Sequence, residues 1–92
     1  MLPPAEPRAY AFLIEAEADP GFLPRLLTAV ARLSLYPRRL QVDGAGEAGL
    51  LFVNMQLAGL SRQQAETMRD RVAGMVGVHQ ARLLPVPGSA VA

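Results

Sequence analysis

Two similar halves make up most of the sequence, and each half predicts a strand, an amphipathic helix and a second strand. The first half opens with YAFLIEAEA, residues 10–18, in which the side chains alternate between two faces. Tyr10, Phe12 and Ile14 fall on one face, and Leu13 and Glu15 fall on the other, as a strand requires. Because the segment is apolar over most of its length, we expect it to lie at the centre of a sheet.

The first strand ends at residues 19–21, DPG, since proline cannot extend a hydrogen-bonded ladder and glycine tolerates turn dihedrals. Apolar residues then recur at spacings of three and four, which predicts a helix that continues until Tyr36 and Pro37: Phe22, Leu23, Leu26, Leu27, Val30 and Leu33. Pro24 is compatible only with the first turn of that helix. Residues 38–43, RRLQVD, alternate again and predict a half-exposed edge strand.

The second half begins with a glycine-rich segment, residues 44–49, that predicts a hairpin connection to an antiparallel strand over residues 50–60. Ser61 and Gln64 have the spacing of a capping box, in which each side chain satisfies a backbone amide of the other residue. The helix that follows has a buried stripe up to Gly77, formed by Ala65, Met68, Val72, Met75 and Val76. Residues 78–86 predict a short last strand.

The order βαββαβ predicts an α+β fold of the ferredoxin-like type. With right-handed crossovers, an antiparallel four-stranded sheet has the order 4-1-3-2 and both helices lie on one face. The other face has no helix, and we expect Leu13, Leu50 and Phe52 there. Monomers rarely expose such patches, so either an edge strand pairs with a second copy or the bare face is covered. We expect one domain over residues 9–86, with loose ends at residues 1–8 and 87–92.

Composition excludes several classes of function. Nine arginines and eight acidic residues leave a formal charge of +1, which is too balanced for a nucleic-acid binder. There is no cysteine, and the single histidine, His79, has no partner at metal-ligand spacing, so we expect neither a metal nor a cofactor. No segment has the pattern of a signal peptide or the length of a membrane span. We therefore expect a soluble cytoplasmic protein.

The sequence resembles an ACT domain, the small amino-acid-sensing module of many biosynthetic enzymes, and most closely the regulatory small subunit of acetohydroxyacid (acetolactate) synthase. The resemblance covers most of the chain and rests on the first strand and three short stretches: Pro20-Gly21-Phe22-Leu23 with Arg25 after it, Ala31-Arg32, and Leu40-Gln41-Val42. It implies a non-catalytic allosteric module that dimerises through its sheet. It also implies a branched-chain amino acid near the dimer interface and a larger catalytic subunit as partner.

The backbone amides of Gly21, Phe22 and Leu23 are candidates for binding the carboxylate of such a ligand. They fall at a helix N-terminus, where unsatisfied N–H groups and the helix dipole favour an anion. Alternatively, Asp19 caps its own helix and satisfies the same amides. Both interpretations use the same donors, so the sequence alone does not choose between them.

Arg38 and Tyr36 are the other candidate ligand contacts. In a sheet-paired dimer a neighbouring turn lies near the start of the second strand, where Arg38 can meet a carboxylate. The alternatives are a solvated edge-strand arginine and a core tyrosine. Ser34 and Tyr36 stand where the resembled family commonly has glycine and asparagine, which favours a second hypothesis: a structural interaction subunit with a degenerate ligand site.

Enzymatic activity is disfavoured by the remaining polar residues. Glu15 and Glu17 lie on one face of the first strand, and nothing else supplies a pocket, nucleophile or metal partner. We expect them to be charges on the face without helices, which pair with Arg38 or Arg39 across strands or subunits. Asn54 is present where an acylphosphatase of related topology needs an asparagine, but residues 18–25, ADPGFLPR, do not resemble a phosphate cradle.

Overall fold

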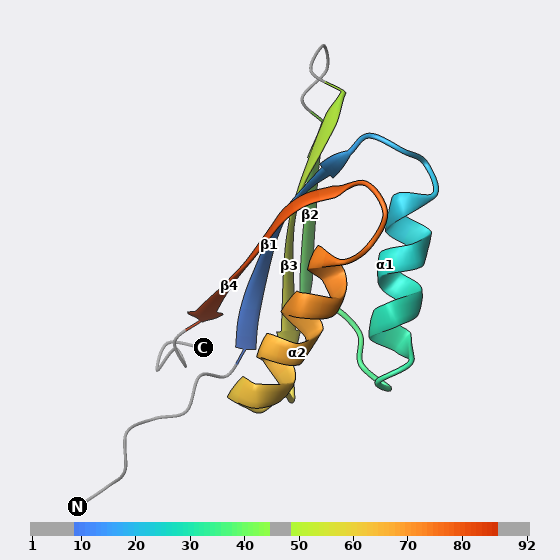
Figure 1. Cartoon of the computed structure of the whole chain (residues 1–92). Coiled ribbons are helices and arrows are strands. Elements are labelled where there is room, and N and C mark those ends of the chain that lie inside the picture. Colours follow the sequence, from blue (N-terminus) through green and yellow to red (C-terminus); the bar gives the residue numbers. More distant parts are fainter. Residues whose placement is uncertain (1–8, 45–48, 87–92) are drawn as a thin grey trace, which may run out of the picture.

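The computed structural model describes residues 9–44 and 49–86. Six elements follow one another in the order βαββαβ (Figure 1): β1 (Ala9–Glu17), α1 (Phe22–Ala31), β2 (Arg39–Gly44), β3 (Leu50–Ala58), α2 (Arg62–Ala73) and β4 (Val78–Val86). The predicted N-terminal arm, C-terminal tail and most of the hairpin connection lie outside the described residues. Within the described part of the chain, no helix is long and apolar enough to cross a membrane.

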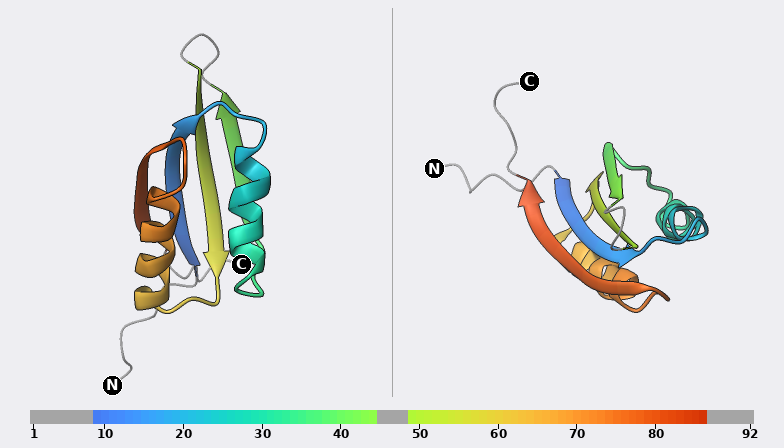
Figure 2. Two further views of the ribbon diagram at one scale, coloured as in Figure 1. Left: turned by 45° about the vertical axis from the view of Figure 1, so that its right-hand side comes forward. Right: turned by 90° about the horizontal axis from the view of Figure 1, so that it is seen from above.

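One antiparallel sheet contains all four strands in the order β2-β3-β1-β4. This is the predicted order 4-1-3-2 counted from the opposite edge, and the ferredoxin-like fold is confirmed. Both helices cover the same face of the sheet, with α1 over the β2 and β3 half and α2 over the β1 and β4 half (Figure 2). The connections therefore leave β2 and β4 at the two edges.

The core lies between the helices and the inward-facing side chains of the two central strands. Phe12 on β1 is opposite Met55 on β3, and both are fully buried beneath Leu26 of α1 and Val72 of α2. The alternation predicted for β1 and β3 is confirmed. The other face of the sheet, here called the open face, has no helix over it and presents Leu13, Glu15 and Glu17 of β1, Phe52, Asn54 and Gln56 of β3, Arg39, Gln41 and Asp43 of β2, and Gln80, Arg82 and Leu84 of β4.

Helix α2 begins at the predicted capping box. The Gln64 N–H donates to Ser61 Oγ at 3.1 Å, and the Ser61 N–H donates to Gln64 Oε1 at 2.8 Å. Two amides that would otherwise lack a helical partner are thus satisfied at the first turn.

Helix α1 ends earlier than its apolar stripe predicts, because a Schellman motif terminates it. The Ser34 N–H donates to the Ala31 carbonyl at 2.8 Å, and the Leu35 N–H donates to the Val30 carbonyl at 3.4 Å. Ser34 has a φ of 60°, a left-handed conformation in which glycine is favoured. Leu33 therefore lies in the turn after the helix and is 41% exposed, which corrects the prediction of a helix that continues to Tyr36.

Two further expectations about burial were wrong. The helical spacing predicts Val76 in the buried stripe of the second helix, but α2 ends at Ala73 and Val76 is 83% exposed in the turn before β4. Tyr36, for which a core position was one alternative, is 72% exposed in the connection between α1 and β2. In both cases the helix ends before the apolar residue, so its side chain no longer points along the buried stripe.

Candidate functional site

The turn between β1 and α1 already uses two of its three candidate amides. Asp19 Oδ1 accepts a hydrogen bond from the Gly21 N–H at 3.2 Å, and the Asp19 carbonyl accepts one from the Phe22 N–H at 2.9 Å. The N-cap residue of α1 is Gly21, and no side chain caps it. Asp19 thus satisfies amides within its own turn, as one alternative predicted, but it does so as a turn residue and not as the helix N-cap.

Leu23 supplies the remaining amide. Among the described residues, no acceptor within the chain is found for its N–H. Pro24, the third residue of α1, has no N–H, and the Arg25 N–H donates to the Gly21 carbonyl at 3.3 Å. The helix N-terminus therefore offers one free backbone donor instead of three. The side chain of Phe22 is buried in the core, where it anchors the turn.

Arg25 adds a cation to the same turn. Its terminal nitrogens Nη1 and Nη2 each lie 3.3 Å from Asp19 Oδ2, and both side chains are half-exposed. Gly21 makes room for this contact, because a Cβ at that position would lie 2.9 Å from Arg25 Nη1. An exposed pair of this kind stabilises the fold by only ~0–1 kcal/mol, so a ligand carboxylate can replace Asp19 on Arg25 at little cost.

Tyr36 and Arg38 lie in the connection that follows the C-terminal end of α1, whereas the Asp19 turn precedes its N-terminal end. Figure 1 shows these two connections at opposite ends of the helix. Tyr36 and Arg38 line a surface hollow of about 420 Å³ together with Ser34, Leu35, Ala58 and Gly59. A helix of ten residues, ~15 Å long at 1.5 Å per residue, separates this hollow from Gly21. A single chain therefore does not bring the two halves of the predicted site together.

The open face contains a polar cluster that the sequence did not predict. His79 Nδ1 lies 3.6 Å from Glu15 Oε2, and His79 Nε2 lies 3.4 Å from Glu17 Oε2. A break in the β1–β4 register between Glu15 and Ala16 leaves His79 as the extra residue of β4. The expected pairing of these glutamates with Arg38 or Arg39 is absent within the described chain, because β3 lies between β1 and β2. The described residues contain no cluster of three metal-ligating side chains.

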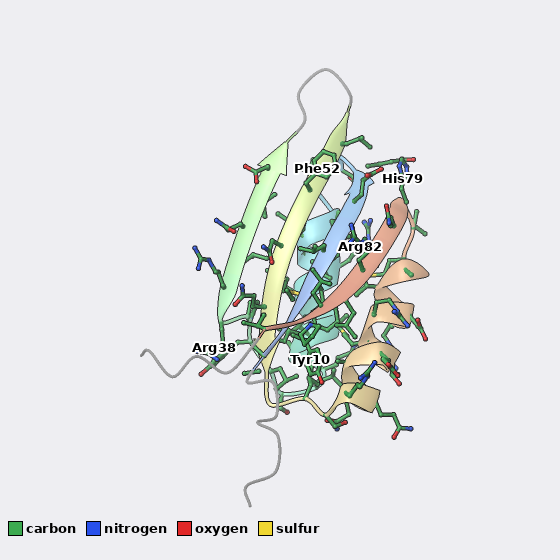
Figure 3. All side chains as sticks on the ribbon, turned by 90° about the vertical axis from the view of Figure 1, so that its left-hand side faces the viewer. Tyr10, Arg38, Phe52, His79 and Arg82 are labelled. Carbon is green, nitrogen blue, oxygen red and sulfur yellow. The ribbon has the colours of Figure 1, made fainter. Side chains whose placement is uncertain are left out.

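A shallow groove of about 360 Å³ crosses the open face next to this cluster. Leu13 and Phe52 are among the residues that line it, and polar side chains from all four strands surround them (Figure 3): Glu15, Gln41, Asp43, Asn54, Gln80 and Arg82. The Oδ1 atom of Asn54 is buried and accepts no hydrogen bond from the described residues. Asn54 therefore lines the groove while its Oδ1 atom lies buried beneath the groove surface.

Three comparisons with known proteins bear on this fold. A sequence model of ACT-like domains matches residues 5–89. The ACT domain of a GTP pyrophosphokinase from Chlorobium tepidum superposes with a TM-score of 0.71 at 14% identity, covering 85% of this chain and 99% of that one. The C-terminal domain of the MgtC protein from Mycobacterium tuberculosis superposes with a TM-score of 0.70 at 10% identity, covering 99% and 100% of the two chains. A comparison with curated protein sequences finds no match.

The two solved structures share the fold of this chain, and the sequence model extends over nearly its whole length. ACT domains are typically ligand-binding regulatory modules. The βαββαβ order, the sheet order and the sequence match together show that this chain belongs to the family of ACT-like domains.

Proposed function

We propose that this protein is a non-catalytic regulatory module that pairs with a second copy and binds a small amino acid between the two copies. The observation on which the proposal depends is the separation of the two halves of the candidate site. Arg25 and the free Leu23 amide lie at one end of α1, and Arg38 lies at the other. Pairing of two β2 strands places one half from each copy side by side.

Strand β2 is suited to pairing with its own copy. It is an edge strand, all six of its residues are exposed, and its apolar residues Leu40 and Val42 are each 38% exposed. When two copies pair antiparallel about a two-fold axis at Gln41, Arg39 lies opposite Asp43 of the partner, and Leu40 lies opposite Val42 of the partner. Opposite charges and apolar side chains that face each other across strands both favour this register.

The same register explains how Arg38 completes the site. Arg38 of the partner subunit lies opposite Gly44, at the end of the sheet where β1 leads into the Asp19 turn. It shares the helix-covered side with Leu40 and Val42, and α1 lies over this half of the sheet (Figure 2). The N-terminus of α1 and Arg38 of the partner subunit are thus brought to the same corner of the pair.

A free amino acid matches the charges at that corner. Its carboxylate binds Arg25, the Leu23 N–H and Arg38 of the partner subunit, and its ammonium replaces Arg25 as the partner of Asp19. Tyr36 of the partner subunit, which is exposed in one chain, covers the ligand side chain. Binding of a free amino acid therefore replaces the internal Asp19–Arg25 pair with two charge-assisted contacts. One joins Arg25 to the ligand carboxylate, and the other joins Asp19 to the ligand ammonium.

The sequence resemblance is the ground on which a ligand and a regulated protein are proposed. We propose a branched-chain amino acid as ligand and the larger catalytic subunit of an acetohydroxyacid synthase as partner. A ligand that contacts both copies favours the arrangement of the pair in which the site is closed. It changes the partner's activity by at most its difference in binding free energy between the two arrangements.

A second candidate function is a structural interaction subunit that binds no amino acid. The hydrogen bonds of Asp19 to Gly21 and Arg25 favour it, because they already occupy most of the donors at the turn. Ser34 and Tyr36, which replace the glycine and asparagine of the resembled family, point the same way. In this case the Asp19 turn serves only to start α1.

Thermal unfolding in the presence of single amino acids distinguishes the two functions. A ligand at a hundred times its Kd adds ~2.7 kcal/mol to the free energy of unfolding, which for a domain of this size raises Tm by more than ~10 °C. We expect such a shift with one branched-chain amino acid, its loss in Arg38→Ala and its retention in Arg71→Ala, a control on α2. No shift with any amino acid contradicts the proposal and favours the structural subunit.

A further inference from the structure

A further hollow, here called the helix-side hollow, lies at the end of the molecule where α1 ends and α2 begins (Figure 1). Leu33 and Leu35 line it from the connection after α1, Leu60 lines it from the residues before α2, and Met68 and Arg71 line it from α2 itself. Its volume is about 310 Å³, at the lower end of the range of ~300–1,000 Å³ that is typical of small-molecule sites.

The wall of the helix-side hollow is largely apolar. Met68 is buried, Leu35 and Leu60 are half-buried against the core, and Leu33 is exposed at the rim. Gly59 also lines the hollow; it has a φ of 82°, which favours glycine, and it contributes no side chain to fill the space. The fold thus leaves part of an apolar wall in contact with water, which solvates it poorly, so a hydrocarbon group is favoured there.

Arg71 supplies a cation that forms no ion pair with any described residue. The other two arginines of α2 are both paired, since Arg62 Nε lies 3.3 Å from Glu66 Oε2 and Arg69 Nε lies 2.8 Å from Asp70 Oδ1. None of the described residues that line the hollow is acidic. An anion that binds Arg71 in the hollow therefore meets no competing carboxylate.

Three uncharged polar residues of α2 also line the hollow: Gln63, Gln64 and Thr67. Gln64 Oε1 accepts the Ser61 N–H at 2.8 Å, so the capping box holds this side chain in place, and its amide nitrogen donates to no described residue. Side-chain amides and hydroxyls can both donate to a carboxylate. The hollow therefore combines an apolar wall, one guanidinium and a few uncharged donors, a composition that suits a small amphipathic anion.

We propose that the helix-side hollow binds an aliphatic monocarboxylate, with its carboxylate on Arg71 and its hydrocarbon chain against the apolar wall. A guanidinium and a carboxylate form paired hydrogen bonds that orient the ligand. The ligand carries no amino group, because no acidic side chain lines the hollow to balance an ammonium. Gln63 and Arg71 are ~12 Å apart along α2 at 1.5 Å per residue, a length that extended octanoate approaches and butyrate does not.

This site is separate from the amino acid site of the proposed function. It lies within one chain, so it needs no second copy, and it uses a different arginine. The two sites adjoin, because Leu35 and Gly59 line both the helix-side hollow and the hollow of Tyr36 and Arg38. Arg71→Ala removes a contact of the aliphatic carboxylate only, and Arg38→Ala removes a contact of the amino acid only. Failure of one proposal therefore leaves the other intact.

Titration of the isotope-labelled chain with octanoate, followed by two-dimensional NMR below the micelle concentration, tests the proposal. We expect saturable shifts of the backbone amides of residues 33–35, 59–60 and 67–71. The dissociation constant should rise at least tenfold in Arg71→Ala, because a charge-assisted contact is lost. It should also rise in Leu33→Glu, which places a carboxylate at the rim. Arg62→Ala, an exposed change on the same helix outside the hollow, should leave it within about twofold.

Two further probes separate the roles of the chain and the charge. Hexanoate should bind at least about fourfold more weakly than octanoate, because each buried methylene changes affinity by a factor of roughly two to four. Octylammonium has the same hydrocarbon chain with the opposite charge. It should bind at least tenfold more weakly than octanoate, because it cannot pair with Arg71.

The NMR spectrum of each variant without ligand shows whether it is folded before its affinity is interpreted. Absence of saturable shifts with octanoate overturns the proposal. Shifts confined to another part of the chain also overturn it, because they place the ligand elsewhere. Equal affinities of Arg71→Ala and Arg62→Ala, or of octanoate and octylammonium, contradict the pairing of the carboxylate with Arg71.

Discussion

Arg25 donates to the Asp19 carboxylate through both of its terminal nitrogens, each 3.3 Å from Oδ2, across the turn that begins α1. The contact satisfies a cation and an anion that would otherwise both be available to a ligand. It is also half-exposed, and an exposed pair of this kind stabilises a fold by only ~0–1 kcal/mol. In the proposed function, an amino acid therefore competes with this internal pair for the turn.

Asp19→Ala is expected to separate the role of the carboxylate in folding from its role in binding. Loss of an exposed pair and one turn hydrogen bond lowers the free energy of unfolding by about 1 kcal/mol. Binding of the zwitterionic amino acid should weaken at least tenfold, because its ammonium loses its partner. Binding of the corresponding carboxylic acid without the amino group should strengthen, because Arg25 is freed. Isothermal titration calorimetry measures both affinities.

Asp70→Ala is the matched control for Asp19→Ala. Asp70 also pairs with an arginine, since Arg69 Nε lies 2.8 Å from its Oδ1, but the pair is on the surface of α2. Neither affinity should change in Asp70→Ala. If Asp19→Ala left the amino acid affinity as unchanged as Asp70→Ala does, the ammonium contact would be excluded.

Ser34→Gly is expected to stabilise the protein. Ser34 adopts a φ of 60° at the position of the Schellman motif that follows α1, where a side chain costs ~1 kcal/mol relative to glycine. Because 1 kcal/mol shifts Tm by roughly 4–8 °C in a domain of this size, thermal unfolding should show a rise in that range. Ser34→Ala keeps the Cβ and should show no rise; equal Tm values for the two variants would contradict the explanation.

Ser61→Ala is expected to destabilise the start of α2. The substitution removes the oxygen that accepts the Gln64 N–H at 3.1 Å, and loss of such a cap costs ~0.5–2 kcal/mol. Chemical denaturation should show a lower midpoint with an unchanged slope. Gln63→Ala, an exposed change in the same helical turn, serves as control and should lie within about 0.5 kcal/mol of the unchanged protein.

The register of β2 pairing predicts that two substitutions, each of which weakens pairing alone, restore it when they are combined. Leu40→Glu places a charge opposite Val42 of the partner subunit, and Val42→Arg places a charge opposite Leu40 of the partner subunit, so each should weaken edge pairing. In the double variant, the glutamate of each copy lies opposite the arginine of the other copy. The two resulting pairs of opposite charges should restore edge pairing. Analytical ultracentrifugation measures the dissociation constant of the pair; a double variant weaker than either single variant would exclude this register.

The overall fold follows from signals that are local in the sequence. The alternation through Phe12 and Ile14 and the capping box of Ser61 and Gln64 each depend on neighbouring residues, and both are found in the structure. Right-handed crossovers then leave one arrangement of the four strands. For that reason the sheet order could be predicted without knowledge of any long-range contact.

Two kinds of feature could not be predicted. Some depend on contacts between distant segments, and one depends on a serine at the left-handed position after a helix, which is usually glycine. The bulge that places His79 between Glu15 and Glu17 is a property of the β1–β4 register. The end of α1 was placed too late because Ser34 occupies a position where glycine would have given a clear stop signal. The sequence predicts a helix between the Asp19 turn and Arg38, but it could not show that Arg25 pairs with Asp19 across that turn.

The central claim is that one ligand site contains groups from two copies. Mixing two variants that each lack amino acid binding tests this claim most directly. Arg25→Ala and Arg38→Ala should each lose amino acid binding, since each removes one arginine from every site. When equal amounts are mixed and allowed to exchange, about half of the pairs contain one chain of each kind and recover one intact site. Calorimetry should then show binding at about one site per four chains. Absence of binding in the exchanged mixture would contradict a site shared between two copies.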